Sequence, residues 1–169
     1  MKNTIVVIIF TLIAKLSFAQ SVDFDLIKYK GLDFYSTKSE IIQKLGKPKK
    51  TYDPNYDCGF LSTDDSQIIH FVTLDYGNIK FTGNKKDKYV LDRVYFENDN
   101  SIVVQYGNRN LTHKTDFSEL IELLGDKIKE GFGKKLDGAF IIFNEGYDDG
   151  IRIYIINGKL TRLEYWSSC

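Results

Sequence analysis

The sequence predicts an α+β fold built from two tandem repeats, each of one helix followed by three or four antiparallel strands, with the helices packed on one face of the sheet. Tyr and Phe are abundant and there are only two Pro residues, a composition that suits the half-buried surfaces of strands. A helix-like stretch occurs twice, and a hairpin pattern follows each copy. With 169 residues, the chain is long enough for one domain with a substantial core.

The first helix is expected between residues 36 and 46. Ser36 or Thr37 can serve as its N-cap, and Glu40 stands where the acid of a capping box belongs. Gly46 is a typical C-cap, and Pro48 prevents the helix from continuing. The apolar face of this helix consists of Ile41, Ile42 and Leu45.

A second helix is expected between residues 115 and 125, where the same pattern returns at an offset of 79 positions. The corresponding landmarks are Glu40 with Glu119, Leu45 with Leu124, and Gly46 with Gly125. Because two stretches share both their capping residues and their stop signal, the sequence indicates an internal duplication.

Each expected helix is followed by alternating apolar residues that a turn interrupts, which is the pattern of an antiparallel hairpin. The turns contain Gly83-Asn84 in the first copy and Asn157-Gly158 in the second. The expected hairpin strands are 77–81 with 90–96, and 149–153 with 159–165. Further strands are expected at 69–76, 102–106 and 139–143. The first repeat would then cover residues 20–110 and the second residues 111–169, within one structural domain.

Residues 1–19 have the pattern of a secretory signal peptide. Lys2 supplies the positive charge, residues 5–14 form the apolar run, interrupted only by Thr11, and Ala19 ends a cleavage site before Gln20. The Phe-Ala-Gln ending resembles leaders common in Bacteroidetes. The apolar run is too short for a permanent span, and no Cys follows the cleavage point to carry a lipid anchor. We therefore expect a periplasmic or secreted protein with no membrane span or lipid anchor; the alternative is a buried N-terminal strand.

Charge is balanced, with 23 basic and 23 acidic residues in the whole chain. Removal of the leader would take away Lys2 and Lys15, so the mature chain would carry a net charge of about −2. This balance argues against a general nucleic-acid binder, which needs a basic surface to displace counterions. It also argues against a polybasic protein of the membrane surface.

The two cysteines, Cys58 and Cys169, are expected to form a disulfide in an oxidising compartment. The bridge would close a loop of about 110 residues and stabilise the fold by on the order of 4 kcal/mol. A cysteine nucleophile is the alternative. It would need a neighbouring base, and neither of the two histidines, His70 and His113, can be placed beside a thiol from the sequence.

The run from Thr37 to Pro48 resembles a motif of the outer-membrane assembly lipoprotein family SmpA/OmlA, a Thr-x-x-Glu helix that ends in Leu-Gly-x-Pro. Two such units in tandem resemble the β-lactamase inhibitor protein, whose paired sheets form a concave surface that grips another protein. The resemblance covers the layout of residues 30–169 and implies a helix–sheet repeat with a protein partner. The second copy departs from the motif at Asp126-Lys127, and the lipobox Cys of the assembly lipoproteins is absent.

Residues 53–59, together with Asp64, resemble a Ca²⁺ loop because oxygen-bearing side chains alternate along them. Cys58 stands where such a loop requires Gly, so an Asp-rich turn is the favoured interpretation. His70 in an expected strand and His113 in a polar connector do not make a metal site. We therefore expect neither a metal nor a cofactor.

A second acidic patch consists of Glu145, Asp148 and Asp149 in an expected turn. Paired carboxylates can carry out acid–base chemistry when they face each other across a cleft. In a turn they more often face water, so we expect no catalytic residue here.

Alternation along the expected strands assigns one face of the sheet to the core and the other to the outside. The inward set is Val94, Phe96, Ile151, Ile153, Ile155, Leu163 and Tyr165. The outward set is Arg93, Tyr95, Arg152, Tyr154, Arg162, Glu164 and Trp166. Tyr, Trp and Arg are enriched at interaction hot spots. The alternative is that a second layer covers this face, or that these residues are ordinary cross-strand pairs.

The sequence thus predicts a non-enzymatic exported protein that binds another extracytoplasmic protein through this outward face, as an inhibitor or immunity protein would. In this prediction Tyr95, Tyr154 and Trp166 are anchors, and the three arginines pair with acidic groups of the partner. Two alternatives stay open. One is an envelope-assembly accessory protein, as the SmpA/OmlA-like motif implies, and the other is a secreted hydrolase.

Overall fold

The computed structural model describes residues 21–56, 70–86, 88–125, 127–132, 137–144 and 146–168. Several predictions concern residues outside these ranges: the signal peptide, the Cys58–Cys169 bridge, and the acidic residues Asp64 and Glu145. They stay predictions.

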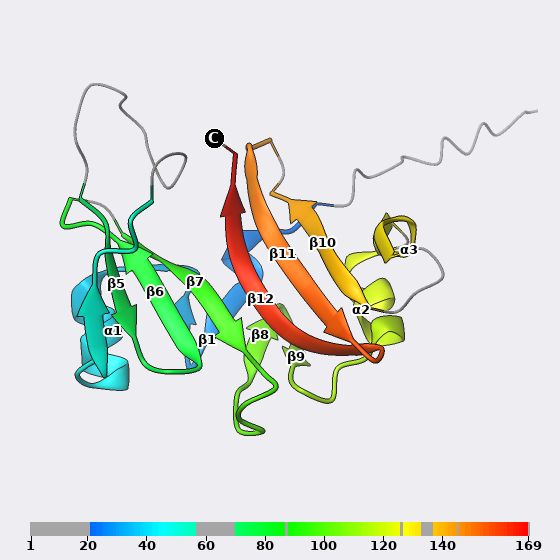
Figure 1. Cartoon of the computed structure of the whole chain (residues 1–169), viewed down its shortest axis with the longest axis horizontal. Helices are drawn as coiled ribbons and strands as arrows, with labels where there is room; N and C mark the ends of the chain where they lie inside the picture. The colour runs from blue at the N-terminus through cyan, green and yellow to red at the C-terminus, as the bar shows by residue number, and fades with distance from the viewer. Residues whose placement is uncertain are drawn as a thin grey trace, which may run out of the picture.

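The strands form two antiparallel sheets, a large one of eight strands and a small one of four (Figure 1). In spatial order the large sheet contains β10 (Gly138–Phe143), β11 (Asp149–Ile156), β12 (Lys159–Ser167), β7 (Tyr89–Tyr95), β6 (Ile79–Gly83), β5 (Val72–Asp75) and β4 (Lys50–Tyr52), and β3 (Tyr35–Ser36) also pairs with β7. The small sheet contains β2 (Leu32–Asp33), β1 (Ile27–Tyr29), β8 (Val104–Tyr106) and β9 (Arg109–Leu111). The helical segments are η1 (Phe24–Leu26), α1 (Lys38–Leu45), α2 (Phe117–Leu124) and α3 (Lys127–Phe132).

This architecture corrects the predicted fold class. The chain is mostly sheet, and it is not a pair of helix-plus-strand repeats, because both halves contribute strands to the large sheet and a separate small sheet forms from residues 27–33 and 104–111. Leu163 of β12 pairs with Val94 of β7, so the large sheet continues from one half into the other. Ile27 of β1 pairs with Tyr106 of β8 in the small sheet. The small sheet was missed because its strands have only two or three residues, too few to show alternation.

Predictions that depend on local sequence are confirmed for the two principal helices. Thr37 caps α1, and its backbone N–H donates to the Glu40 carboxylate at 2.7 Å in a capping box. Asp116 caps α2 with Glu119 in the same arrangement. Each helix ends at the glycine expected to stop it. Among the described residues, no helix combines the length and apolar character needed to cross a membrane.

The hairpin of β11 and β12 turns at Asn157-Gly158, as predicted. Both residues have positive φ, which a two-residue type I′ turn requires. The first predicted hairpin also forms, from β6 and β7. The strand expected at 102–106 appears as β8, but it belongs to the small sheet.

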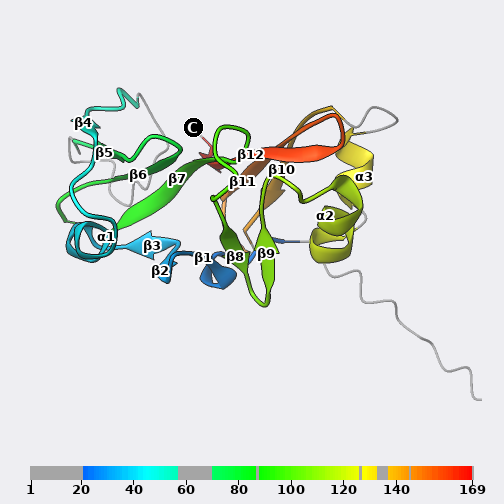
Figure 2. The ribbon, with the colours of Figure 1, turned by 90° about the horizontal axis from the view of Figure 1, so that it is seen from below.

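The core lies between the large sheet and a second layer made of the small sheet and the helices. Figure 2 shows α1, α2 and the small sheet on the same side of the large sheet. A cavity of about 20 Å³ between the layers is lined by Ile27 and Val104 of the small sheet and by Ile151 and Ile153 of the large one. On the opposite side of the large sheet, no described helix or strand is packed (Figures 1 and 2). Part of that side is nevertheless buried, because Thr73, Thr82 and Asp92 of β5, β6 and β7 are at most 2% exposed.

Candidate protein-binding face

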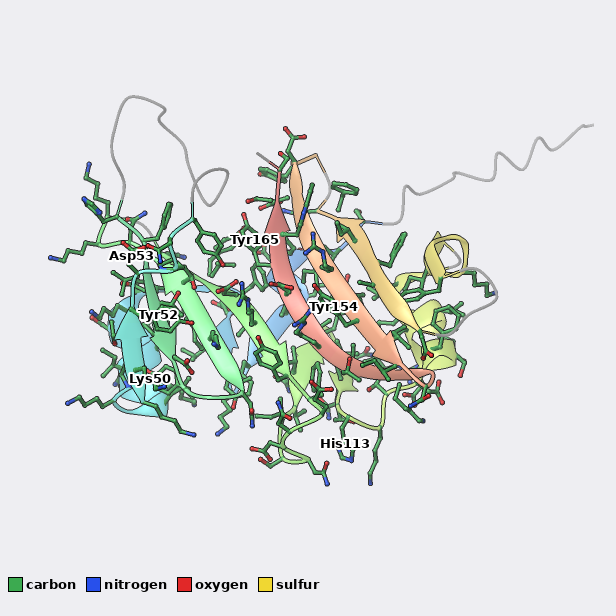
Figure 3. All side chains as sticks on the ribbon, viewed as in Figure 1. Lys50, Tyr52, Asp53, His113, Tyr154 and Tyr165 are labelled. Atoms are coloured by element: carbon green, nitrogen blue, oxygen red, sulfur yellow. The ribbon has the colours of Figure 1, made fainter. Side chains whose placement is uncertain are left out.

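The seven residues predicted to point outward lie on β7, β12 and β11, three neighbouring strands of the large sheet. All seven are half-buried, whereas the predicted inward set is buried. Figure 3 shows Tyr154 on the side of the sheet away from the helices. We call this surface the open face and define it by Arg93, Tyr95, Arg152, Tyr154, Arg162, Glu164 and Trp166, with Lys50, Asp75, Lys80 and Phe143 beside them.

A row of charged residues crosses the open face at right angles to the strands. From β11 to β4 it consists of Arg152, Glu164, Arg93, Lys80, Asp75 and Lys50. Each neighbouring pair in this row is directly opposite in the backbone register, so the side chains point to the same face. Nζ of Lys80 lies 3.3 Å from the Asp75 carboxylate, which links the row on its β5–β6 side.

Glu164 is the centre of the open face. Its Oε1 lies 3.0 Å from Nε of Arg93, and its Oε2 accepts a hydrogen bond from the Tyr154 hydroxyl at 2.8 Å. Nη2 of Arg162 lies 3.8 Å from the same Oε2. Because these partners come from β7, β11 and β12, one carboxylate holds side chains of three strands in place.

A second row, parallel to the charged one, consists of Tyr154, Arg162 and Tyr95. The guanidinium carbon of Arg162 lies 3.5 Å from the centre of the Tyr154 ring and 5.7 Å from that of Tyr95. Both distances are in the range of cation–π contacts. The arginine is therefore held between two aromatic rings and does not extend freely into solvent.

A third row contains Phe143, Gly150 and Trp166 on β10, β11 and β12. The rings of Phe143 and Trp166 lie 5.4 Å apart at 89°, an edge-to-face contact beside Gly150. A Cβ on Gly150 would come within 2.3 Å of the Ile142 carbonyl oxygen, so glycine is required there. Sequence analysis did not assign Phe143, which is 50% exposed, to this surface. Side chains alternate along residues 139–143, so an inward Ile142 would have predicted that Phe143 points outward.

Asp92 is a buried carboxylate at the edge of the open face, only 2% exposed. The register between β6 and β7 shifts here, so Asp92 is the extra residue of a β-bulge next to Arg93. Thr82 donates a hydrogen bond to Asp92 at 2.7 Å, and the Tyr56 hydroxyl lies 3.3 Å from both of its oxygens. Burial raises the pKa of Asp92, against the lowering effect of the Thr82 hydrogen bond. Sequence analysis missed this residue because a single Asp in a strand gives no sign of its burial.

Asp92 and Glu164 both lie near Arg93, whose Nε is 3.9 Å from the first carboxylate and 3.0 Å from the second. In the described part of the chain, no histidine donates to or accepts from either carboxylate. Within the same ranges, no three His, Cys, Asp or Glu residues are grouped to hold a metal ion. Both carboxylates are engaged in positioning arginines and hydroxyls.

The acidic patch predicted near residue 149 has a structural role in the described residues. Asp149 accepts hydrogen bonds from Tyr35 at 3.2 Å and from Tyr165 at 3.1 Å, at the edge of a cavity of about 620 Å³. Burial raises the pKa of both tyrosines, so they stay protonated donors. Asp148 is exposed to solvent. These contacts tie the start of β11 to β3, across 114 positions of sequence.

The Asp-rich turn begins as predicted, because the backbone N–H of Asn55 donates to the Asp53 side chain at 2.8 Å. The rest of the Ca²⁺-like run, from residue 57, lies outside the described ranges. His70 is exposed, and Nδ1 of His113 is buried with no hydrogen-bond partner among the described residues. Figure 3 shows Asp53 and His113 in separate parts of the molecule.

A scan against protein-family models found no match, and searches of curated proteins and of solved structures found none either. The resemblance to SmpA/OmlA proteins and to the β-lactamase inhibitor protein therefore stays a prediction. The proposal for function is therefore argued from the geometry of the open face.

Proposed function

We propose that this chain is an exported, non-catalytic protein that binds another extracytoplasmic protein through the open face and occludes it, as an inhibitor or immunity protein does. One observation carries the proposal. Seven aromatic and charged residues lie in adjacent rows on three neighbouring strands, on the side of the large sheet that no described helix or strand covers.

The composition and rigidity of the open face support this proposal. A few residues carry most of the binding energy at protein interfaces, and Trp, Tyr and Arg are enriched among them. Here the Tyr154 hydroxyl and the Arg93 guanidinium are held by Glu164, and Arg162 is stacked between two tyrosine rings. Side chains that are already ordered lose less conformational entropy when a partner binds.

Charge on the open face favours an acidic partner surface. Five basic side chains and three carboxylates lie on or beside it, a net charge of +2: Lys50, Lys80, Arg93, Arg152 and Arg162 against Asp75, Asp92 and Glu164. The excess is local, because the whole chain has equal numbers of basic and acidic residues. Complementary charge speeds association and fixes the orientation of the partner.

The contacts within the chain distinguish the three arginines, all of which were predicted to pair with acidic groups of a partner. Arg93 and Arg162 lie against Glu164 within the chain. Arg152 has no ion-pair partner among the described residues and is the arginine best placed to meet a partner carboxylate. At the β10 side of the face, Phe143 and Trp166 supply an apolar contact.

Site-specific photocrosslinking tests the proposal. Benzoylphenylalanine in place of Phe143 keeps an aromatic ring on the open face, and the same probe in place of Ile42, 39% exposed on α1, samples the opposite side. We expect a single extracytoplasmic protein to be crosslinked from position 143 and not from position 42.

Binding of the identified partner is then measured with purified proteins. We expect the Arg152→Ala, Trp166→Ala double variant to bind at least tenfold more weakly, a loss of about 1.4 kcal/mol or more. Ile42→Ala is the control and should bind as the wild type does. Equal crosslinking from both positions, or unchanged affinity of the double variant, would overturn the proposal.

A further inference from the structure

A second surface feature lies away from the charged rows, between the first turn of α1 and the loop that joins β6 to β7. It is a cavity of about 540 Å³. Four lysines line it: Lys38 from α1, and Lys85, Lys86 and Lys88 from the loop. We call it the lysine cavity. Its volume is in the range of small-molecule sites.

The ends of the loop approach each other closely, and a hydrogen bond orders its first residues. A Cβ on Gly83 would lie 2.5 Å from the Lys88 carbonyl oxygen, so the two chains of the hairpin approach closely only because residue 83 is glycine. Asn84 is 4% exposed, and its side chain accepts a hydrogen bond from the Lys86 backbone N–H at 2.8 Å. Lys85 and Lys86 therefore belong to a turn that the Asn84 side chain closes.

The lysine cavity carries uncompensated positive charge. Lys38, Lys85 and Lys88 have no ion-pair partner among the described residues. Glu40 lies at the same end of α1 and interacts electrostatically with Lys88, while its Oε2 accepts hydrogen bonds from the backbone N–H and the hydroxyl of Thr37. Even when Glu40 and Asp87 of the loop sequence are counted, the four lysines leave an excess of two positive charges.

Lys38 occupies an electrostatically unfavourable position. It is the first residue of α1, where the partial positive charge of the helix N-terminus favours an acid. Three further lysines converge on the same cavity, and like charges at close range repel one another. An anion bound in the cavity would offset these repulsions, because it attracts the four ammonium groups and the helix N-terminus.

We propose that the lysine cavity binds a phosphorylated sugar or polyol with at least two phosphate groups, either free or as the headgroup of a lipid. Lysine ammonium groups are effective point-charge ligands for phosphate. Thr37, Ser39 and Asn84 add hydroxyl and amide groups to the lining, which can hydrogen-bond sugar hydroxyls. The site is separate from the open face and does not depend on protein binding there.

Calorimetric titration of the purified protein with inositol hexakisphosphate, as a polyphosphate probe, tests the proposal. We expect binding that Lys85→Glu with Lys88→Glu weakens at least tenfold. Lys44→Glu with Lys47→Glu changes the net charge equally at the other end of α1 and should bind as the wild type does. No binding to the wild type, or equal loss in the two double variants, would overturn the proposal.

The Lys38→Glu variant distinguishes a loss of ligand binding from a loss of folding stability. Because an acid suits the helix N-terminus, this variant should melt at a higher temperature than the wild type without ligand. It should also lose the rise in melting temperature that the probe causes in the wild type. A variant that retains the full ligand-induced rise would show that Lys38 does not contact the ligand.

Two further probes identify the source of the phosphate groups. Co-sedimentation with vesicles that contain phosphatidylinositol bisphosphate, lost in the Lys85→Glu, Lys88→Glu variant, assigns the site to a lipid headgroup. Binding of the soluble probe without co-sedimentation assigns it to a free phosphorylated compound. A single-stranded oligonucleotide that binds more tightly than inositol hexakisphosphate would instead identify a nucleic-acid site and contradict the proposal.

Discussion

Arg93 and Glu164 face each other where β7 meets β12, with Nε of the arginine 3.0 Å from Oε1 of the glutamate. At this boundary the large sheet passes from the first half of the chain to the second. The same carboxylate accepts a hydrogen bond from Tyr154 of β11. One side chain thus contributes both to the continuity of the sheet and to the order of the open face.

Replacement of Glu164 by Gln is expected to lower the free energy of unfolding by about 1–2 kcal/mol, between the values for exposed and buried ion pairs. Arg93 would lose the nearer of its two carboxylate partners while its side chain stays only 32% exposed. Urea denaturation measures the change. Glu122→Gln, on the exposed surface of α2, is the matched control and should change stability by less than about 0.5 kcal/mol. Equal effects of the two substitutions would show that the ion pair does not stabilise the β7–β12 boundary.

Asp92→Asn is expected to change the pH dependence of stability. Because burial raises the pKa of Asp92, the folded chain holds this proton more tightly than the unfolded chain does. The ionised carboxylate therefore costs stability at pH values above the folded pKa, and this cost disappears as the pH falls below the ordinary value of the group.

The Asn variant cannot ionise, so at pH 7 it should be more stable than the wild type, and the difference should narrow as the pH falls to about 4. Urea denaturation of both proteins across this range gives the comparison. A difference that is constant, or that widens on acidification, would show that Asp92 does not titrate as its burial implies.

Gly150→Ala is expected to destabilise the protein by about 2–3 kcal/mol, because the new Cβ would overlap the Ile142 carbonyl oxygen at 2.3 Å. The displaced strand would also separate Phe143 from Trp166. Trp166 is the only tryptophan of the chain, so its fluorescence reports this contact directly. Ala139→Ser, on the exposed start of β10, should leave both stability and the emission spectrum unchanged.

Thr37→Ala removes the N-cap of α1 and is expected to cost about 1 kcal/mol. The cause is local, because the Glu40 backbone N–H would lose its acceptor. Gln43→Ala, on the exposed side of the same helix, is the control and should be neutral or slightly stabilising. Thermal melting compares the two. A loss in the control as large as in the cap variant would indicate that α1 is held by tertiary contacts and not by its cap.

Features that depend on neighbours within a few residues could be predicted from the sequence. The capping boxes of α1 and α2 need only a cap residue and an acid three positions later. The Asn157-Gly158 turn needs two residues that tolerate positive φ. The inward and outward faces of β7, β11 and β12 follow from alternation, so the seven residues of the proposed binding surface were placed on one face correctly.

Features that depend on distant partners could not be predicted. The small sheet exists because β1 and β8 meet from opposite ends of the first half. β1 is too short to show alternation, and the strand pattern of β8 does not indicate its partner. The burial of Asp92 follows from a β-bulge and from Tyr56, which is 36 positions away. The lysine cavity likewise requires Lys38 to lie opposite a loop more than forty positions later.

By itself the sequence determined which residues begin and end α1 and α2, where the hairpins turn, and which side chains share a strand face, because short-range sterics and hydrogen bonds settle these features. Only the tertiary structure decided that the two halves join as one large sheet backed by a small one, and that Glu164 gathers Arg93, Tyr154 and Arg162 around a single carboxylate. The reason is physical: strand pairing and ion pairing between distant segments depend on which surfaces must be buried together, and no local pattern records that choice.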